Sequence, residues 1–220
     1  FANIQRFVRY LLSSNAGEII AIVINLFLGG PLIFLATQIL WMNLVTDGLP
    51  ALALGVEGPD SDVMKRPPRP PQAPIVDRNF AVQVVAVGLL MAVASLVVGI
   101  TAWEPGATPA AAQAAAHGGH AAAAASRWQT MLFSTMVFAQ LFLAMAVRAS
   151  RESVFRKGLF SNRAMIAALA GTLLLQLAVI YVPVLQTFFR TTPLSVGQLG
   201  LCLAGGAVLF VAVELHKLAA

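Results

Sequence analysis

Long apolar stretches dominate the chain, and polar residues are concentrated in the short segments between them. A helix that crosses the hydrocarbon core of a bilayer needs about 20 mostly apolar residues. Six segments meet that requirement, and they lie at roughly 3–28, 33–55, 80–103, 128–148, 163–182 and 196–217. The pattern predicts an all-α integral membrane protein, with residues 1–220 forming one bundle of six transmembrane helices.

The positions of the basic residues predict how this bundle is oriented. Six crossings place both termini on one side of the membrane, and 12 of the 14 Lys and Arg residues fall on that side. Only Arg127 and Arg190 fall on the other side. Cytoplasmic loops carry an excess of Lys and Arg. We therefore expect a multi-pass protein of the cell membrane with both termini in the cytoplasm.

Two of the predicted loops have a distinctive composition. Residues 56–79 form a proline-rich cytoplasmic loop, which is typical of a stiff, solvated connector. Residues 104–127 form an outer loop rich in alanine, with His117 and His120 around a Gly-Gly pair. Two histidines at that spacing could contact a metal ion, but a low-complexity connector is the interpretation that we favour.

Composition agrees with a membrane protein. The chain is 59% hydrophobic and 10% charged, whereas soluble domains carry about 25% charged residues. Its formal charge of +5 comes from basic residues between the apolar segments, so it does not indicate a nucleic-acid partner. A single cysteine, Cys202, excludes an internal disulfide.

Two of the nine acidic residues, Glu18 and Asp47, lie deep inside predicted spans. An ionisable side chain is costly at that depth unless it faces the interior of the bundle and has a partner. The sequence places no Lys or Arg at the same depth. The two carboxylates therefore call for protons or for a cation that comes from outside the chain.

Amide and hydroxyl residues accompany both acids. Asn15 and Glu18 are three residues apart and share a face of the first predicted helix. Asn43, Thr46 and Asp47 share a face of the second by the same rule.

A sixth polar residue, Gln140, is predicted at a similar depth on the fourth helix, counting 1.5 Å of rise per residue. All these groups offer oxygen, and oxygen ligands suit hard cations such as Ca²⁺, Mg²⁺ or Mn²⁺ better than copper or zinc. Gly48 and Pro50 directly follow Asp47, and we expect them to loosen the second helix and free backbone carbonyls as further ligands.

Three segments carry a resemblance to a known family. Residues 3–18 read NIQRFVRYLLSSNAGE and resemble the fifth transmembrane helix of P-type calcium pumps. Residues 38–51 read QILWMNLVTDGLPA and resemble the sixth, and residues 64–69, MKRPPR, match the loop that follows it. The other four spans fit helices seven to ten by their order. The whole chain thus resembles the C-terminal transmembrane region, helices five to ten, of a bacterial P2-type cation pump.

This resemblance implies a set of roles. The implied ligands of the transported cation are Asn15, Glu18, Asn43, Thr46 and Asp47, with Gln140 where the reticulum-type pumps carry a glutamate. The implied cargo is Ca²⁺, with Mn²⁺ next, and a neutral amide at Gln140 favours one ion per cycle. The implied partners are membrane lipid and the upstream part of the same pump. That part would hold helices one to four and the actuator, phosphorylation and nucleotide domains, where ATP and Mg²⁺ act.

Two other classes of protein remain possible from the residues alone. An ion-coupled secondary transporter could also use two intramembrane carboxylates. A non-transporting helical scaffold could use the polar residues to join helices. Neither class accounts for the long matched segments.

Overall fold

The computed structural model describes residues 2–58, 75–103, 121–149, 153–158 and 160–219. Within those ranges every regular element is helical, which confirms the predicted all-α class. Five of the described helices are long and apolar enough to cross a membrane: α1 (Ala2–Phe27), α4 (Arg78–Thr101), α6 (Ala121–Val147), α8 (Arg163–Tyr181) and α10 (Val196–Ala219). His117, His120 and most of the proline-rich loop lie outside the described residues.

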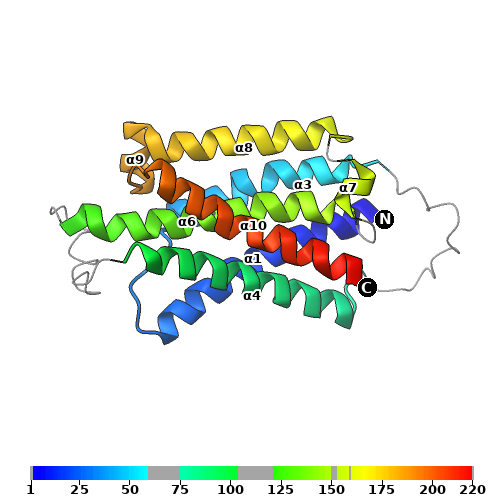
Figure 1. Ribbon diagram of the computed structural model, residues 1–220, viewed down its shortest axis with the longest axis horizontal. Coiled ribbons are helices and arrows are strands. Elements are labelled where there is room, and N and C mark those ends of the chain that lie inside the picture. Colours follow the sequence, from blue (N-terminus) through cyan, green and yellow to red (C-terminus); the bar gives the residue numbers. More distant parts are fainter. Residues whose placement is uncertain (1, 59–74, 104–120, 150–152, 159, 220) are drawn as a thin grey trace, which may run out of the picture.

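The predicted span 33–55 is not one continuous helix. It consists of α2 (Ala36–Trp41), a π-helical turn η1 (Met42–Thr46) and α3 (Gly48–Gly55). Figure 1 shows the N- and C-terminal ends at the same end of the bundle, as an even number of crossings requires. The count of six crossings stays a prediction, because the second crossing is broken into segments that are each too short to span a bilayer.

Two short helices lie in segments that the sequence analysis treats as connections: α7 (Val154–Lys157) and α9 (Pro183–Phe189). Helix α8 ends at Tyr181 because Val182 precedes Pro183 and takes an extended conformation, which proline favours in the residue before it. Residues 121–127, which are predicted as part of the outer loop, are already helical in α6, since alanine continues a helix readily.

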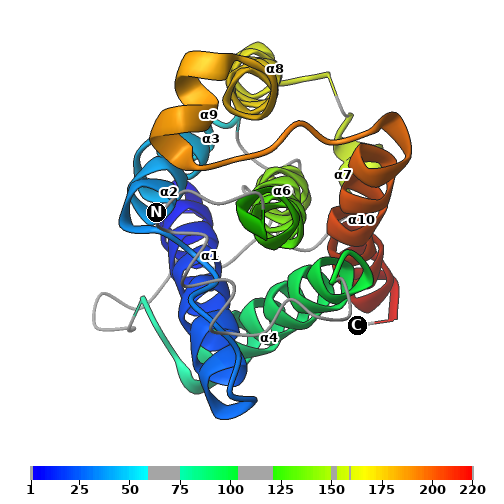
Figure 2. The same cartoon turned by 90° about the vertical axis from the view of Figure 1, so that its left-hand side faces the viewer.

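Helix α6 occupies the centre of the bundle. Viewed along the bundle, it is surrounded by α1, α3, α4, α8 and α10 (Figure 2). Within the most apolar 18-residue stretch of each helix, 89% of the residues of α6 are buried, against 22% of those of α10. The buried polar side chains of α6 are Thr130, Ser134, Thr135 and Gln140. Exposed leucines, valines and phenylalanines cover the outer helices, as contact with lipid requires, and the four polar side chains of α6 lie within a largely apolar core.

Helices α1 and α4 approach each other closely at Gly88. A Cβ atom at Gly88 would lie 2.9 Å from the Cβ of Ala16 and 3.0 Å from the backbone N of Gly17. Small residues permit such contact between membrane helices, where packing rather than hydrophobicity drives association. This contact fixes α1, which carries Glu18, against the rest of the bundle.

We expect Gly88→Ala to destabilise the protein by about 1–3 kcal/mol, because the added methyl would push the backbone of α1 away. The matched control is Gly200→Ala on α10, where an added Cβ meets nothing within 4 Å. That control should leave stability unchanged or raise it slightly. Thermal unfolding of the full-length protein in detergent compares the two, and equal effects would contradict the assigned contact.

A cluster of charged and amide side chains at the end of α3 joins four helical segments around Glu57. Arg148 donates to both carboxylate oxygens of Glu57, at 2.9 and 3.3 Å. Asn162, the N-cap of α8, donates to the same carboxylate at 2.8 Å, and the ammonium of Lys157 lies 3.4 Å away. Glu57 is predicted to lie in a solvated loop, but its side chain is buried. Burial opposes ionisation of Glu57, yet the hydrogen bonds from Arg148 and Asn162 outweigh it and lower the pKa.

This lowered pKa predicts how the cluster responds to pH. The stabilisation from Glu57 is fully present above the ordinary carboxyl pKa of 4.5 and is lost as the pH falls through the lower value of the folded state. We expect Glu57→Gln to lower the unfolding temperature at neutral pH, with a difference from wild type that shrinks under acid. A difference that stayed constant down to acid pH would refute the pairing.

Candidate cation site

Glu18 lies on the inward face of α1. Buried positions recur along this helix every three or four residues, from Arg6 through Tyr10 and Glu18 to Ala21, which is the spacing of one helical face. The side chain of Glu18 is 3% exposed. Because α1 packs beside the central helix, the carboxylate points toward groups from two other elements.

Two amides hold the Glu18 carboxylate. Gln140 on α6 donates to Oε1 at 2.9 Å, and Asn43 on η1 donates to Oε2 at 3.3 Å. The Thr46 hydroxyl in turn donates toward the side-chain oxygen of Gln140 at 2.8 Å. Glu18, Asn43, Thr46 and Gln140 therefore form one hydrogen-bonded network across α1, η1 and α6.

The π-helical turn has an identifiable local cause. Pro50 has no backbone N–H, so the carbonyl of Thr46, four residues earlier, loses its helical partner. The Tyr10 hydroxyl on α1 donates to that carbonyl at 2.9 Å instead. The backbone N–H of Asp47 reaches back five residues to Met42 at 2.8 Å, the spacing of a π-helix. The expected loosening of this helix at Gly48 and Pro50 is present, although one of the freed carbonyls is already bound.

Asp47 is the unsatisfied member of the site. Its side chain is fully buried, and neither carboxylate oxygen has a hydrogen-bond partner among the described residues. The hydroxyls of Tyr10 and Ser14 on α1 face this carboxylate, but Tyr10 donates to a carbonyl and the Ser14 oxygen is itself without a partner in the described chain. A buried carboxylate without partners costs several kcal/mol unless a proton or cation neutralises it.

The structure connects most of the predicted site residues but not all of them. Glu18, Asn43, Thr46 and Gln140 are joined directly, and Asp47 follows Thr46 at the end of the π-helical turn. Asn15 shares the face of Glu18, but its amide donates to the carbonyl of Leu11 on the same helix at 2.9 Å. Asn43 is exposed on its other side.

Tyr10 and Ser14 contribute to the site but were not predicted as site residues. Tyr10, Ser14 and Glu18 recur at intervals of four residues on α1, a polar stripe that could have revealed the first two.

The candidate ligands of the site all offer oxygen, and two of them are carboxylates. In the described part of the chain, no three His, Cys, Asp or Glu side chains lie close enough together to hold a metal ion among themselves. Such a site suits a hard divalent cation and offers it two negative charges.

These features define an integral membrane bundle of helices with a central, anionic, oxygen-lined site. Residues 31–219 match the sequence profile of the family described as the C-terminus of cation transporting ATPases. The chain belongs to that family, and the prediction of a P-type ATPase C-terminal membrane region is confirmed.

Curated relatives cover nearly the whole chain. It is 38% identical to the calcium-transporting ATPase of Bacillus subtilis over 94% of the chain and 22% of that relative. It is 36% identical to the mouse calcium-transporting ATPase type 2C member 2 over 99% of the chain and 22% of that relative. Calcium-transporting ATPase 1 of Yarrowia lipolytica is 35% identical over 90% of the chain. The chain thus spans about a fifth of the length of these relatives.

Proposed function

We propose that this chain is the membrane part of an ATP-driven pump that exports Ca²⁺ from the cytoplasm. Its oxygen ligands for the ion are Asn15, Glu18, Asn43, Thr46, Asp47 and Gln140. The observation that carries the proposal is the buried Asp47 carboxylate without a partner, beside a Glu18 carboxylate held by amides. Relatives named as calcium-transporting ATPases favour Ca²⁺ as the cargo, and Mn²⁺ is the next ion that an oxygen set suits.

The upstream part of the longer relatives supplies the rest of the pump in this proposal. Phosphorylation there, with ATP and Mg²⁺, reorients the bundle and releases the ion on the outer side. The exposed face of Asn43 is where further ligands from upstream helices would complete the coordination. Both termini of the chain face the cytoplasm, and the pump lies in the cell membrane, as the distribution of Lys and Arg favours.

The two carboxylates also account for the return half of the proposed transport cycle, after the cation has left. Once the cation leaves, two charged groups in a medium of low dielectric become costly, so protonation of the empty site is favoured. The pump in this proposal therefore carries protons inward as it exports the cation.

Substitution of Asp47 tests the site. In the full-length pump we expect Asp47→Asn to weaken Ca²⁺ activation of ATP hydrolysis by more than the roughly 10–100-fold that the loss of an outer-shell partner costs a metal site. Ca²⁺ should also no longer raise the unfolding temperature of this variant. Asn keeps the shape of Asp but removes the charge that the cation neutralises.

The matched control is Asp77→Asn. Asp77 is exposed and caps α4 by accepting a hydrogen bond from the Phe80 N–H, and asparagine caps equally well. This variant should respond to Ca²⁺ like wild type. Unchanged Ca²⁺ activation in Asp47→Asn would overturn the site, and Ca²⁺ uptake by sealed vesicles without ATP would overturn the pump in favour of a secondary transporter.

The Gln140 amide predicts the stoichiometry. Its NH₂ group donates to Glu18 and its oxygen accepts from Thr46. Because the amide is neutral, it brings no charge to a second ion. We expect one Ca²⁺ bound per phosphorylation site at saturation, measured with radioactive Ca²⁺ on the full-length pump. A ratio of two would contradict this role of Gln140.

A further inference from the structure

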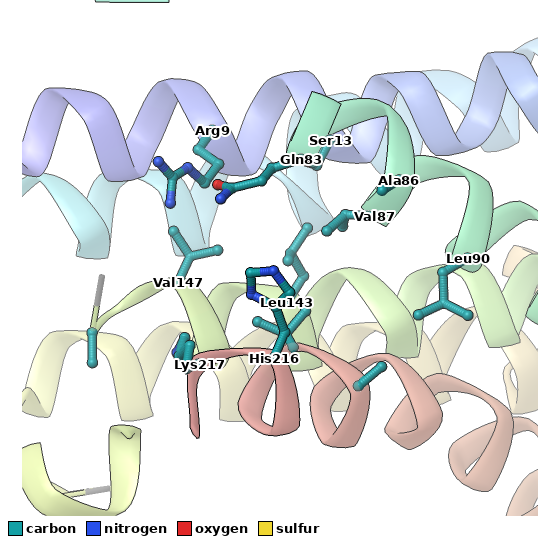
Figure 3. Close-up of a pocket in the computed structure, with 13 residues that line it drawn as sticks. Arg9, Ser13, Gln83, Ala86, Val87, Leu90, Leu143, Val147, His216 and Lys217 are labelled. Carbon is teal, nitrogen blue, oxygen red and sulfur yellow. The ribbon is translucent and has the colours of Figure 1, made fainter. Parts of the chain in front are cut away.

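A cavity of about 560 Å³ lies between α1, α4, α6 and α10, and none of the candidate cation ligands lines it (Figure 3). It lies toward the end of the bundle that carries both termini, since Arg9 near the start of α1 and Lys217 near the end of α10 both line it. Apolar side chains from three helices form its walls: Val87, Leu90, Leu143, Val147 and Val213. Its volume is within the range of ligand pockets in proteins, about 300–1,000 Å³.

Two buried donors in this cavity lack an acceptor. The Ser13 side chain is 0% exposed, and its hydroxyl has no hydrogen-bond partner among the described residues. The Nε of Arg9 is also buried without a partner there, although its guanidinium lies 5.0 Å from the centre of the Phe80 ring. Buried polar groups are nearly always satisfied by protein, water or a ligand. Arg9 and Ser13 lie four residues apart on α1 and both line the cavity. Two such donors together favour a ligand that brings acceptor oxygens.

The charge of the cavity points to an anion. Lys217 is balanced, because it donates to Glu214 at 2.6 Å. Arg9 supplies a positive charge within the lining, the exposed Asp77 at the start of α4 is the acid whose charge acts on it from outside the lining, and His216 lies beside Lys217. Among the described residues that line the cavity none is acidic.

We propose that this cavity binds an anionic phospholipid from the leaflet on the side of the two termini. The phosphodiester oxygens accept hydrogen bonds from Arg9 and Ser13, and the start of one acyl chain lies against the apolar walls. Basic pockets between transmembrane helices bind anionic headgroups in this way. A soluble phosphate would leave the apolar walls uncovered, and a zwitterionic lipid would bring no net charge to Arg9. The site is separate from the cation ligands, so it does not depend on which ion is transported.

Photolabelling of the full-length pump tests this site. The probe is phosphatidylglycerol with a photoactivatable group in its acyl chain, and the readout is the labelling of peptides from α4 and α10. We expect Arg9→Gln to reduce this labelling about fivefold, the loss that removing one basic contact with an anionic headgroup produces. Ala86→Phe, at the cavity lining on α4, should reduce it as well, because the ring fills the space without changing charge.

The control is Arg78→Gln, which removes an exposed positive charge from the same end of α4 outside the cavity lining. Labelling should survive in this variant, and unlabelled phosphatidylglycerol should compete where phosphatidylcholine and inorganic phosphate do not. Equal losses in Arg9→Gln and Arg78→Gln would reduce the effect to general surface attraction and overturn the site. Competition by inorganic phosphate would overturn the lipid in favour of a soluble anion, and equal competition by phosphatidylcholine would remove the need for charge.

Discussion

The broken second crossing at the site depends on one missing backbone N–H, that of Pro50. Without it the carbonyl of Thr46 cannot complete an α-helix, and the Tyr10 hydroxyl takes over as its donor. The extra residue in the π-helical turn changes the direction in which the side chains after it point. Thr46 consequently reaches Gln140 on the central helix, and Asp47 is fully buried at the start of α3. A continuous helix would have satisfied its own carbonyls and left the site without this connection to α1.

The two acids then occupy unequal environments. Glu18 accepts two amide hydrogen bonds, which partly replace the water that it lost on burial. Asp47 accepts none from the described residues. Hydrogen bonds to Glu18 also fix its direction. In the proposed function Glu18 is therefore prepared for a cation before one arrives, whereas Asp47 would gain most of its compensation from the cation itself. Preorganised ligands strengthen binding, and an unsatisfied acid would favour the exchange of cation for proton in the empty site.

The sequence predicted the part of this site that depends on helical periodicity. Spacings of three and four residues placed Asn15 with Glu18 and Asn43 with Asp47, and the apolar pattern placed the long helices. Periodicity could not predict Tyr10 as the donor to a backbone carbonyl, because that contact follows from the π-helical turn and from packing between helices that are distant in sequence. The burial of Glu57 was missed for a similar reason. Its partners Arg148 and Asn162 are about 90 and 105 residues away, and a glutamate beside a proline-rich segment gives no local signal of burial.

The Glu57 cluster gives the broken helix a second fixed end. On one side of Pro50 the backbone is held by Tyr10 of α1, and just beyond α3 the chain is held by Arg148 of α6 and Asn162 of α8. Asn3 of α1 also donates to the carbonyls of Gly55 and Glu57, at 3.0 and 2.8 Å. Helix α1 therefore contacts the broken helix both at the cation site and at the end of α3. A displacement of α1 along its axis would pull on both contacts together, and α3 would move relative to α6, where Gln140 holds Glu18. Such a linkage couples motion at the end of α1 to the spacing of the two carboxylates without requiring any contact between the cation and the segments beyond the membrane.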